Sequence, residues 1–486
     1  MLARSRAHRF PSGHAVAVPS VPVVVLVADG ARADAFSGDL GRLPALQRLR
    51  DEGGAHALTT VFPSVTGPAY APFLLGRFPA GVGLPGLRWY DRTRQACHGP
   101  GHARSYVGWQ MPAINRDLDP AAPTIFELVP DSLAAMSVIT RGLAPARQIG
   151  GLTPASAMRA AATHFRGRVA RWLDVDREVG DAVVRRVHDE RPAYTFAALT
   201  GVDKASHAAG HASALAQDAF AIVDDVVARL RRDAERLGYA GALHLWVASD
   251  HGHGAVHTHE DLAALVARFG PRTIAHPFTL GLAPEVAVMV SGNAMAHLYL
   301  ALADRTRRWW QALAPEWEPL VAMLAARDAV DLVLLPLSAD RCEIRSATRG
   351  RALVEREGAR LRYRRADGDP LGYGTDLEGT ADALHDATRD SAYPDGVLQV
   401  LALTGAARAG DVVLSAAPGH DFRARYEPIP HRSAHGALHR EHMLVPLLTD
   451  RTPARAPRRT TDLFASALDA LGVAPPPVLD GASFLR

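Results

Sequence analysis

The amino-acid sequence predicts an α/β fold with a mostly parallel central sheet. Uninterrupted apolar runs at residues 23–27, 194–199 and 245–248 are typical of parallel strands that are buried on both faces. Between the second and third runs, residues 214–237 carry apolar side chains at helical spacing, and Ser213 can cap the start of that helix. Strands that alternate with helices in this way are typical of a parallel sheet covered by helices.

Changes of pattern divide the chain into four segments. They are an N-terminal arm, a core, a cap-like insertion and a completion of the core, at residues 1–20, 21–285, 290–425 and 426–486. Within the insertion we expect a helix from Trp309 to Ala326, a strand from Val330 to Leu335 and a β-meander from Cys342 to Arg364. The 486 residues are enough for a large α/β domain that carries such an insertion.

The composition is that of a soluble enzyme, with 22% charged and 48% hydrophobic residues. The net charge of +3 is too small to indicate nucleic-acid binding, and no apolar run is long enough to predict a transmembrane helix. The run at 23–27 leads directly into Asp29, so we expect a core strand rather than a cleaved signal, and a cytoplasmic protein without a membrane partner. Cys97 and Cys342 are too few for a disulfide framework. The oligomeric state stays open.

Carboxylates and imidazoles follow each of the three predicted strands. Asp29 comes after the first run, Asp203 and His207 follow the second, and Asp250 and His251 follow the third. Ligands in open α/β sheets bind at the carboxyl ends of the strands, which is where these side chains are expected. Any one of them could be an ordinary turn or helix-cap residue. Three strands that end in the same way favour a shared site.

Thr66, in the segment FPSVTGPAY, is the candidate nucleophile. It precedes Gly67 and a predicted helix from Ala69 to Leu75, so we expect it at the helix N-cap. Free backbone N–H groups and the helix dipole favour an alkoxide or a phosphate at that position. The alternative is an ordinary N-cap threonine. Thr59 and Thr60 are rival hydroxyls, but neither opens a helix.

His435, in the late segment RSAHGAL, adds a further imidazole to the candidate site. Three carboxylates, three imidazoles and one hydroxyl are enough to hold two divalent ions with an alcohol between them. Two ions about 3.5–4 Å apart can clamp the attacking and leaving oxygens of a phosphoryl transfer. Oxygen and nitrogen ligands without a thiolate suit Zn²⁺, although Mn²⁺ or Fe could occupy the same positions.

The order of these segments resembles the alkaline phosphatase superfamily, and within it the type I phosphodiesterase/nucleotide pyrophosphatase branch. The resemblance covers nearly the whole chain and rests on Asp-Gly-x-Arg, the threonine before Gly-x-Phe-Pro, Asp-x-x-x-His, Ser-Asp-His-Gly and a late His-Gly. It implies an alkaline-phosphatase-like sandwich with an inserted cap subdomain, and Thr66 bridging toward the metals. It also implies two zinc ions, held by Asp203, His207 and His435 and by Asp29, Asp250 and His251.

The resemblance implies cleavage of a phosphodiester or pyrophosphate bond through a phospho-threonine intermediate. The substrate would be a small-molecule phosphate ester or a nucleotide-like compound. A phosphomonoesterase or a phosphonate hydrolase would use the same site and stays open. A metal-binding pseudoenzyme also stays open, because Ala69 offers no side-chain donor to a phosphoryl oxygen. Backbone N–H groups at Gly67 and Ala69, or another side chain, would have to serve instead.

Two cations are candidate catalytic residues. Lys204 is the single lysine among 54 basic residues, and it could neutralise a phosphoryl oxygen as a point charge. The alternative is a solvated side chain. Arg32 lies three residues after Asp29 and could instead be structural. Further histidines are expected to line the mouth of the pocket or to orient ligands, namely His211, His253, His257 and His259.

Overall fold

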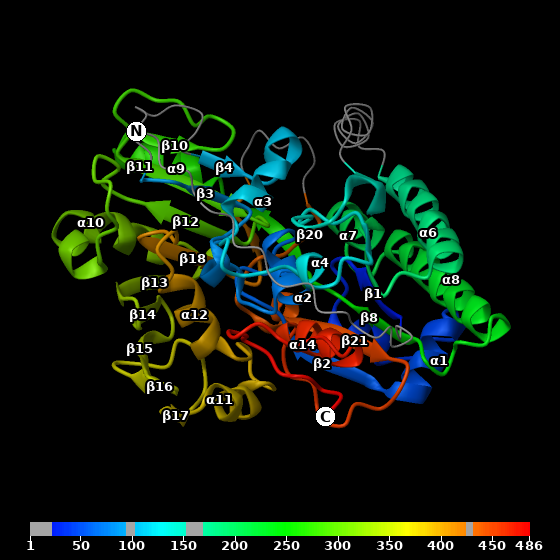
Figure 1. Ribbon diagram of the computed structural model, residues 1–486. Coiled ribbons are helices and arrows are strands. Elements are labelled where there is room, and N and C mark those ends of the chain that lie inside the picture. The colour runs from blue at the N-terminus through cyan, green and yellow to red at the C-terminus, as the bar shows by residue number, and fades with distance from the viewer. Residues whose placement is uncertain (1–21, 94–102, 152–168, 424–430) are drawn as a thin grey trace, which may run out of the picture.

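The structure, a computed structural model, describes residues 22–93, 103–151, 169–423 and 431–486. The expected N-terminal arm at residues 1–20 and the cysteine at position 97 lie outside these ranges. The chain forms two large sheets, of seven and nine strands, with helices packed on them (Figure 1). No helix within the described ranges is both long and apolar enough to cross a bilayer.

The seven-stranded sheet has the order β2-β21-β8-β1-β7-β5-β6. Its strands are β1 (Val23–Ala28), β2 (Ala55–Thr59), β5 (Ser132–Ala135), β6 (Gln148–Ile149), β7 (Tyr194–Leu199), β8 (His244–Ala248) and β21 (Leu444–Thr449). The five strands from β8 to β6 are parallel, whereas β21 runs antiparallel to both β8 and β2. The prediction of a mostly parallel central sheet is therefore confirmed.

Side chains of the central strand β1 alternate between two apolar layers, as the period of a strand requires. Val23, Val25 and Val27 pack on one face, and Val24 and Leu26 on the other. The first layer is covered by α2 (Ala71–Leu75), α4 (Ile125–Leu128) and α14 (Thr461–Ala470). The second is covered by α1 (Pro44–Gly53), α6 (Ala170–Glu190) and α8 (Ala214–Arg236). Helices on both faces make the sandwich that the sequence predicts.

The nine-stranded sheet has the order β10-β11-β12-β18-β13-β14-β15-β16-β17 and is antiparallel except for the β10–β11 pair. Its strands are β10 (Thr273–Ala275), β11 (Val286–Ser291), β12 (Met295–Tyr299), β13 (Val330–Ser338), β14 (Arg341–Ser346), β15 (Gly350–Glu357), β16 (Arg360–Arg365), β17 (Leu377–Gly379) and β18 (Val412–Ala416). The expected strand and meander are β13 to β16, and the expected helix is α10 (Trp310–Ala325). The sheet begins at Thr273, ahead of the expected insertion, and a separate cap domain stays a prediction.

The second sheet packs against the segment that leads to Thr66. One face is covered by α9 (Leu262–Phe269) and α10. The other face is covered by α12 (Gly396–Thr404) together with Val61, Phe62 and Ala69 from the first part of the chain. The predicted insertion therefore packs directly on the segment that leads to Thr66, and its expected role in selecting substrate stays a prediction.

The remaining elements are short connections and edge structures. They are η1 (Ala33–Phe36), η2 (Pro68–Tyr70), η3 (Pro79–Val82), η4 (Gly108–Ala113), η5 (Pro145–Arg147), α3 (Ile114–Asp117), α7 (Gly201–Ala209), α11 (Ala381–Thr388), α13 (Arg440–Met443), β3 (Arg88–Tyr90), β4 (Ala103–Ser105), β9 (Gly254–His259), β19 (Gly419–Asp421) and β20 (Ser433–Ala434). Of these, α7, β9 and β20 matter most below, because they carry or adjoin candidate ligands.

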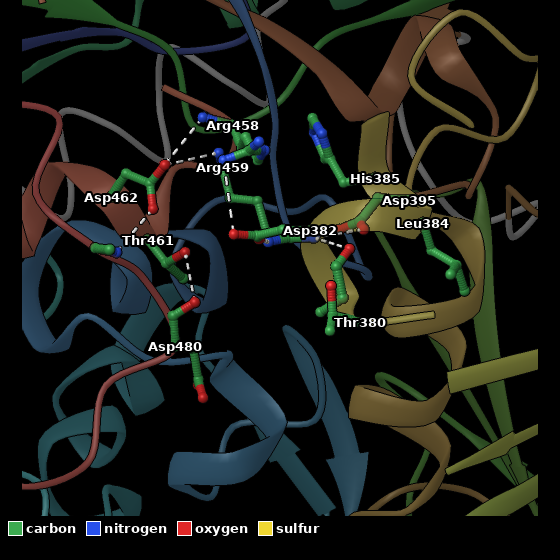
Figure 2. A network of polar contacts seen from close by, with 12 residues as sticks. Thr380, Asp382, Leu384, His385, Asp395, Arg458, Arg459, Thr461, Asp462 and Asp480 are labelled. Atoms are coloured by element: carbon green, nitrogen blue, oxygen red, sulfur yellow. Dashed lines mark hydrogen bonds and ion pairs between the residues drawn. The ribbon is translucent and has the colours of Figure 1, made fainter. Parts of the chain in front are cut away.

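A buried arginine joins the C-terminal part of the chain to helix α11 and to the residue that precedes α12 (Figure 2). Arg459 is 5% exposed and donates to both carboxylate oxygens of Asp395, at 2.8 and 2.9 Å. It also donates to Asp382 Oδ1 at 2.8 Å and to the carbonyl of Ala381, at the start of α11. Nearby, the Thr59 hydroxyl at the end of β2 bonds His385 Nε2 of α11 at 3.1 Å. These contacts fix α11 against the edge of the first sheet.

Candidate active site

Three adjacent strands of the first sheet each lead into a carboxylate. Asp29 follows β1, Asp250 lies two residues beyond β8, and Asp203 lies in the first turn of α7, after β7. Because β8, β1 and β7 are parallel neighbours, their carboxyl ends lie at one edge of the sheet. All three aspartates are at most 1% exposed. The structure therefore brings them together at the predicted edge.

Asp203 is surrounded by three imidazoles. The distances from its Oδ1 atom to Nε2 are 2.9 Å for His253, 3.2 Å for His207 and 3.6 Å for His435. These four donor atoms lie within 4.8 Å of one another and form the first ligand group. His207 comes from α7, one turn beyond Asp203, and His435 follows β20.

Backbone carbonyls orient two of these imidazoles from behind. His207 Nδ1 donates to the carbonyl of Ser433 at 2.8 Å, and His435 Nδ1 donates to the carbonyl of Ser64 at 2.9 Å. A carbonyl can only accept, so Nδ1 carries the proton in each ring. Burial lowers the pKa of His435 well below its ordinary value, so that ring is neutral. Its Nε2 lone pair therefore faces a carboxylate oxygen, an arrangement that a bound cation stabilises.

The second ligand group consists of Asp29, Asp250 and His251. His251 Nε2 lies 3.4 Å from Asp29 Oδ1 and 3.6 Å from Asp250 Oδ2. Burial raises the pKa of Asp29, and the nearby carboxylates of Asp250 and Asp203 raise it further. Burial also raises the pKa of Asp250. Negative charges crowd this group, and a cation bound between them would offset the repulsion.

The Thr66 hydroxyl completes the second group. Its Oγ1 atom lies 2.9 Å from His251 Nε2 and 3.2 Å from Asp29 Oδ1. Metal–ligand bonds of about 2.0–2.1 Å place the corners of a tetrahedron about 3.3 Å apart. The four donor atoms are therefore separated by distances that suit one small divalent ion.

An unsatisfied oxygen supports the same fit. Within the described ranges, the buried Asp250 Oδ2 atom has no hydrogen-bond partner. Such an oxygen is costly to bury unless a partner or an ion satisfies it. Both groups consist of carboxylate oxygens and imidazole nitrogens, which are donors that Zn²⁺ and related ions accept. The residues of both groups therefore fit divalent metal ions.

The expectation that Thr66 caps a helix is wrong. Gly67 is the N-cap residue, with φ +95°, and a 3-10 turn from Pro68 to Tyr70 precedes α2. The backbone N–H of Ala69 is also unavailable to a phosphoryl oxygen, because it donates to the carbonyl of Val65 at 3.0 Å. The Ala69 side chain packs in the apolar layer under the second sheet. Thr66 thus gains its surroundings from Asp29 and His251 rather than from a helix end.

The rival hydroxyls have other partners. Thr60 donates to the backbone carbonyl of Asp250, and Thr59 contacts His385 of α11. Both are fully buried, whereas Thr66 is partly exposed. Among the three threonines, Thr66 is therefore the one that combines access from solvent with contact to the ligand groups.

The lysine binds a candidate ligand. Lys204 Nζ lies 2.7 Å from Asp203 Oδ2, and its side chain is 36% exposed. Burial alone would raise the pKa of Asp203, but Lys204 and then His207 hold that pKa well below its ordinary value. Asp203 therefore stays ionised, with one oxygen toward Lys204 and the other toward the imidazoles. Contact between Lys204 and a phosphoryl group stays a prediction.

Arg32 is held by other side chains. Its guanidinium donates to both oxygens of Asp34, at 3.0 and 2.8 Å, and lies 3.3 Å from Glu441. It also donates to the carbonyl of His253 at 3.1 Å. These contacts favour the structural alternative, and a catalytic role for Arg32 stays a prediction.

The other histidines of this region separate into two classes. His253 lies inside the first ligand group, where the sequence predicted a residue of the pocket mouth or one that orients ligands. His259 bonds Asp421 at 2.7 Å, and His257 is exposed. His211 is partly buried near Arg32 and Asp34. The one feature of the sequence that indicated a place for His253 in a ligand group was its position two residues after the pair Asp250 and His251.

A hairpin of the second sheet also reaches the site. The turn between β11 and β12 has positive φ at both central residues, +59° for Gly292 and +63° for Asn293. The carbonyl of Gly292 accepts the N–H of His435 at 3.2 Å, and the N–H of Ala294 donates to the carbonyl of His435 at 3.1 Å. A Cβ atom at Gly292 would lie 2.6 Å from Val65 Cγ1 and 2.8 Å from His435 Nδ1. The turn is therefore packed directly on a candidate ligand and on the segment that leads to Thr66.

Comparison with known families identifies this arrangement. Residues 23–438 match the family described as Type I phosphodiesterase / nucleotide pyrophosphatase. The chain belongs to this family. It is accordingly a phosphoryl-transfer hydrolase, and its candidate metal-ligand groups lie among the matched residues. No curated protein sequence matches the chain.

Solved structures show the same fold. One similar structure is phosphonoacetate hydrolase from Sinorhizobium meliloti 1021 in complex with phosphonoformate, with 20% identity, a TM-score of 0.53, and coverage of 93% of this chain and 96% of that chain. Another is an inactive form of murine ectonucleotide pyrophosphatase/phosphodiesterase 5 in complex with AMP, with 14% identity, a TM-score of 0.52, and coverage of 94% and 96%. A variant of alkaline phosphatase PafA has 14% identity, a TM-score of 0.59, and coverage of 96% and 99%. These structures confirm the predicted fold class, and the family match confirms the predicted type I phosphodiesterase/nucleotide pyrophosphatase branch.

Proposed function

We propose that this family member is a two-metal phosphohydrolase that cleaves phosphodiester or pyrophosphate bonds through a phospho-threonine intermediate. The observation that carries the proposal is the position of Thr66 Oγ1, at 2.9 Å from His251 and 3.2 Å from Asp29. A nucleophilic hydroxyl at the fourth corner of a ligand group can be activated there at neutral pH. Two bound divalent ions would lower the pKa of this hydroxyl and stabilise charge on the attacking and leaving oxygens.

Each remaining side chain of the site has a separate role in the proposed reaction. Thr66 supplies the oxygen that attacks phosphorus, and the bond to the leaving oxygen breaks as the bond to Thr66 forms. Asp29 and His251 hold that oxygen in place, so little conformational freedom is lost when it attacks phosphorus. Lys204 keeps Asp203 ionised. Water then attacks the phosphorus of phospho-Thr66, the bond from phosphorus to Thr66 Oγ1 breaks, and the phosphate product leaves as a proton from the water restores the hydroxyl.

The proposed substrate is a small phosphate ester or a nucleotide-like compound. The family match supports this class, and the fold neighbours include a protein solved with AMP and one solved with phosphonoformate. A panel of aryl phosphodiesters, nucleotide pyrophosphates, aryl phosphomonoesters and phosphonates would rank these substrates. The highest kcat/KM is expected for a diester or pyrophosphate, and a highest value for a monoester or phosphonate would contradict that choice.

Replacement of Thr66 tests the nucleophile. Thr66→Ala should keep the fold and the metal content but lose nearly all turnover, whereas Thr66→Ser should retain some because it keeps a hydroxyl. Acid quenching during turnover should trap a phosphoryl group on Thr66, located by mass spectrometry. Thr60→Ala is the control hydroxyl variant, because Thr60 contacts only the backbone of Asp250 among the ligand groups. Near-normal turnover in Thr66→Ala would reject the mechanism.

Elemental analysis tests the metals. We propose two Zn²⁺ ions per chain, with Mn²⁺ or Fe as the alternatives that the same donors accept. Asp203→Ala and Asp250→Ala each remove one carboxylate from a different group, so each should lower the metal content by about one ion. Full activity in protein without any transition metal would reject the proposal of two bound metal ions.

A further inference from the structure

The three imidazoles of the first ligand group are arranged almost symmetrically around Asp203. Their ring centroids are separated by 4.8 Å for His207–His253, 5.1 Å for His207–His435 and 5.2 Å for His253–His435. Each ring directs its Nε2 atom to Asp203 Oδ1, with His253 the nearest at 2.9 Å. His253 is therefore equivalent in position to the two histidines that the family resemblance implies as ligands.

The distances suit four donors around one ion. The three separations from Asp203 Oδ1, 2.9, 3.2 and 3.6 Å, lie on both sides of the edge of a tetrahedron, which is about 3.3 Å for bonds of about 2.0–2.1 Å. His253 is fully buried between the sheet edge and β20. A ring at the pocket mouth would instead be exposed to substrate and solvent.

One residue of β20 orients two of the three rings. The backbone carbonyl of Ser433 accepts from His207 Nδ1 at 2.8 Å, and the side-chain hydroxyl of Ser433 bonds His253 Nδ1 at 2.9 Å. Partners of this kind on the outer nitrogen fix the ring and its tautomer in metal sites. His253 therefore has both features of a ligand, an inner nitrogen toward the group and an outer nitrogen held by the protein.

We propose that His253 is the fourth protein ligand of the Asp203 metal ion, which gives this group one carboxylate and three imidazoles. The proposal rests on the two-metal function proposed above. Four protein donors hold a zinc ion firmly, and an ion that expands to five donors in the transition state would still accept the leaving oxygen. In the Asp29 group, by contrast, the fourth donor is the reacting hydroxyl of Thr66. The ion at Asp203 should be retained when the ion at Asp29 exchanges.

Metal retention in His253→Ala tests the proposal. Wild-type protein dialysed against increasing nitrilotriacetate should lose one zinc ion before the other, as measured by elemental analysis. In His253→Ala the retained ion should be lost at a chelator concentration lower by at least about 100-fold, since even a partner behind a ligand is worth 10–100-fold in affinity. Millimolar imidazole should restore retention by filling the vacated position. His431→Ala is the matched control, because the His431 ring lies beside that of His207, with centroids 4.2 Å apart, but outside the group.

A second variant and a spectrum separate a ligand from a positioning residue. If the Ser433 hydroxyl donated to His253 Nδ1, the His253 Nε2–H would donate to Asp203 and the ring would bind no metal. Ser433→Ala removes the hydroxyl but keeps the carbonyl that holds His207, and it should weaken retention about 10-fold. In Co²⁺-substituted protein, His253→Ala should change the visible spectrum of the retained ion, and imidazole should restore it.

The outcomes distinguish this proposal from the proposed function. Wild-type retention and an unchanged Co²⁺ spectrum in His253→Ala would overturn the fourth ligand and leave the two-metal function intact. Wild-type protein without bound metal would overturn both. If His253→Ala does not fold, the Co²⁺ spectrum and zinc retention of Ser433→Ala decide, and wild-type values for both would overturn the proposal.

Discussion

Replacement of Gly292 by alanine should disable the site without unfolding the protein. The added Cβ would lie 2.6 Å from Val65 Cγ1, 2.7 Å from the carbonyl oxygen of His435 and 2.8 Å from His435 Nδ1. Carbon atoms in favourable contact lie about 3.5–4.0 Å apart, so the turn or its neighbours must move by about 1 Å. A misplacement of about 1 Å can lower the rate about 100-fold. We therefore expect kcat/KM to fall by about two orders of magnitude.

Alanine at Gly292 would also be strained, because the backbone there is left-handed. A matched variant separates this strain from the steric clash of the added Cβ. Gly292 has φ +59°, and Gly358, in the turn between β15 and β16, has φ +58° with no atom within 4 Å of an added Cβ. Each alanine should lower the free energy of unfolding by about 1–2 kcal/mol, the cost of left-handed backbone. Gly358→Ala should keep wild-type turnover and metal content.

The assays are kcat/KM on an aryl phosphodiester, zinc content and urea unfolding of both variants. Gly292→Ala should lose turnover and zinc while it still unfolds cooperatively. If its kcat/KM stayed within a factor of two of that of Gly358→Ala, the second sheet would not position His435 and Thr66 in the way described.

Three further changes test the structure elsewhere. Arg459→Ala should lower the free energy of unfolding in urea by about 3–5 kcal/mol, because it leaves the buried Asp395 carboxylate unpaired. A loss below about 1 kcal/mol, the size typical of surface ion pairs, would contradict this role. Burial lowers the pKa of His297 to about 4 against 6.5 for the free side chain, so its contribution to stability is present above pH 6.5 and lost as the pH falls toward 4. The destabilisation caused by His297→Gln should accordingly be about 2 kcal/mol smaller at pH 5 than at pH 7. An equal loss of unfolding free energy at both pH values would refute the lowered pKa of His297. Lys204→Ala should lower kcat/KM more for a monoester dianion than for a diester monoanion if the ammonium reaches the phosphoryl group, and an unchanged ratio would limit Lys204 to its contact with Asp203.

The part of the site that follows strands could be predicted from the sequence. A continuous apolar run identifies a buried parallel strand, and the residue after it must lie at the carboxyl edge of the sheet. Asp29, Asp203 and Asp250 were placed in this way, and the structure brings them together. The fold class was predictable for the same reason, because the period of apolar residues is a local property of the chain.

Contacts between distant segments of the chain could not be predicted from local sequence patterns. His253 was predicted outside the ligand group because its orientation depends on Ser433, 180 residues later in the chain. The N-cap expectation for Thr66 failed because Gly67 adopts φ +95° and Ala69 is packed under the second sheet. The support of His435 by Gly292 depends on a hairpin from that same sheet. Each of these contacts joins segments that are distant in sequence, so no window of neighbouring residues could reveal them.

The order of the central strands has a consequence for evolution. The three aspartates follow β8, β1 and β7, and neighbouring strands lie about 4.7–4.9 Å apart because backbone hydrogen bonds set their spacing. The separation of the two ligand groups is thus fixed by the main chain of the sheet rather than by side chains. Loops at its edge can lengthen or change sequence without altering that separation. Substrate range can therefore diverge among related proteins while the distance between the two ligand groups is inherited.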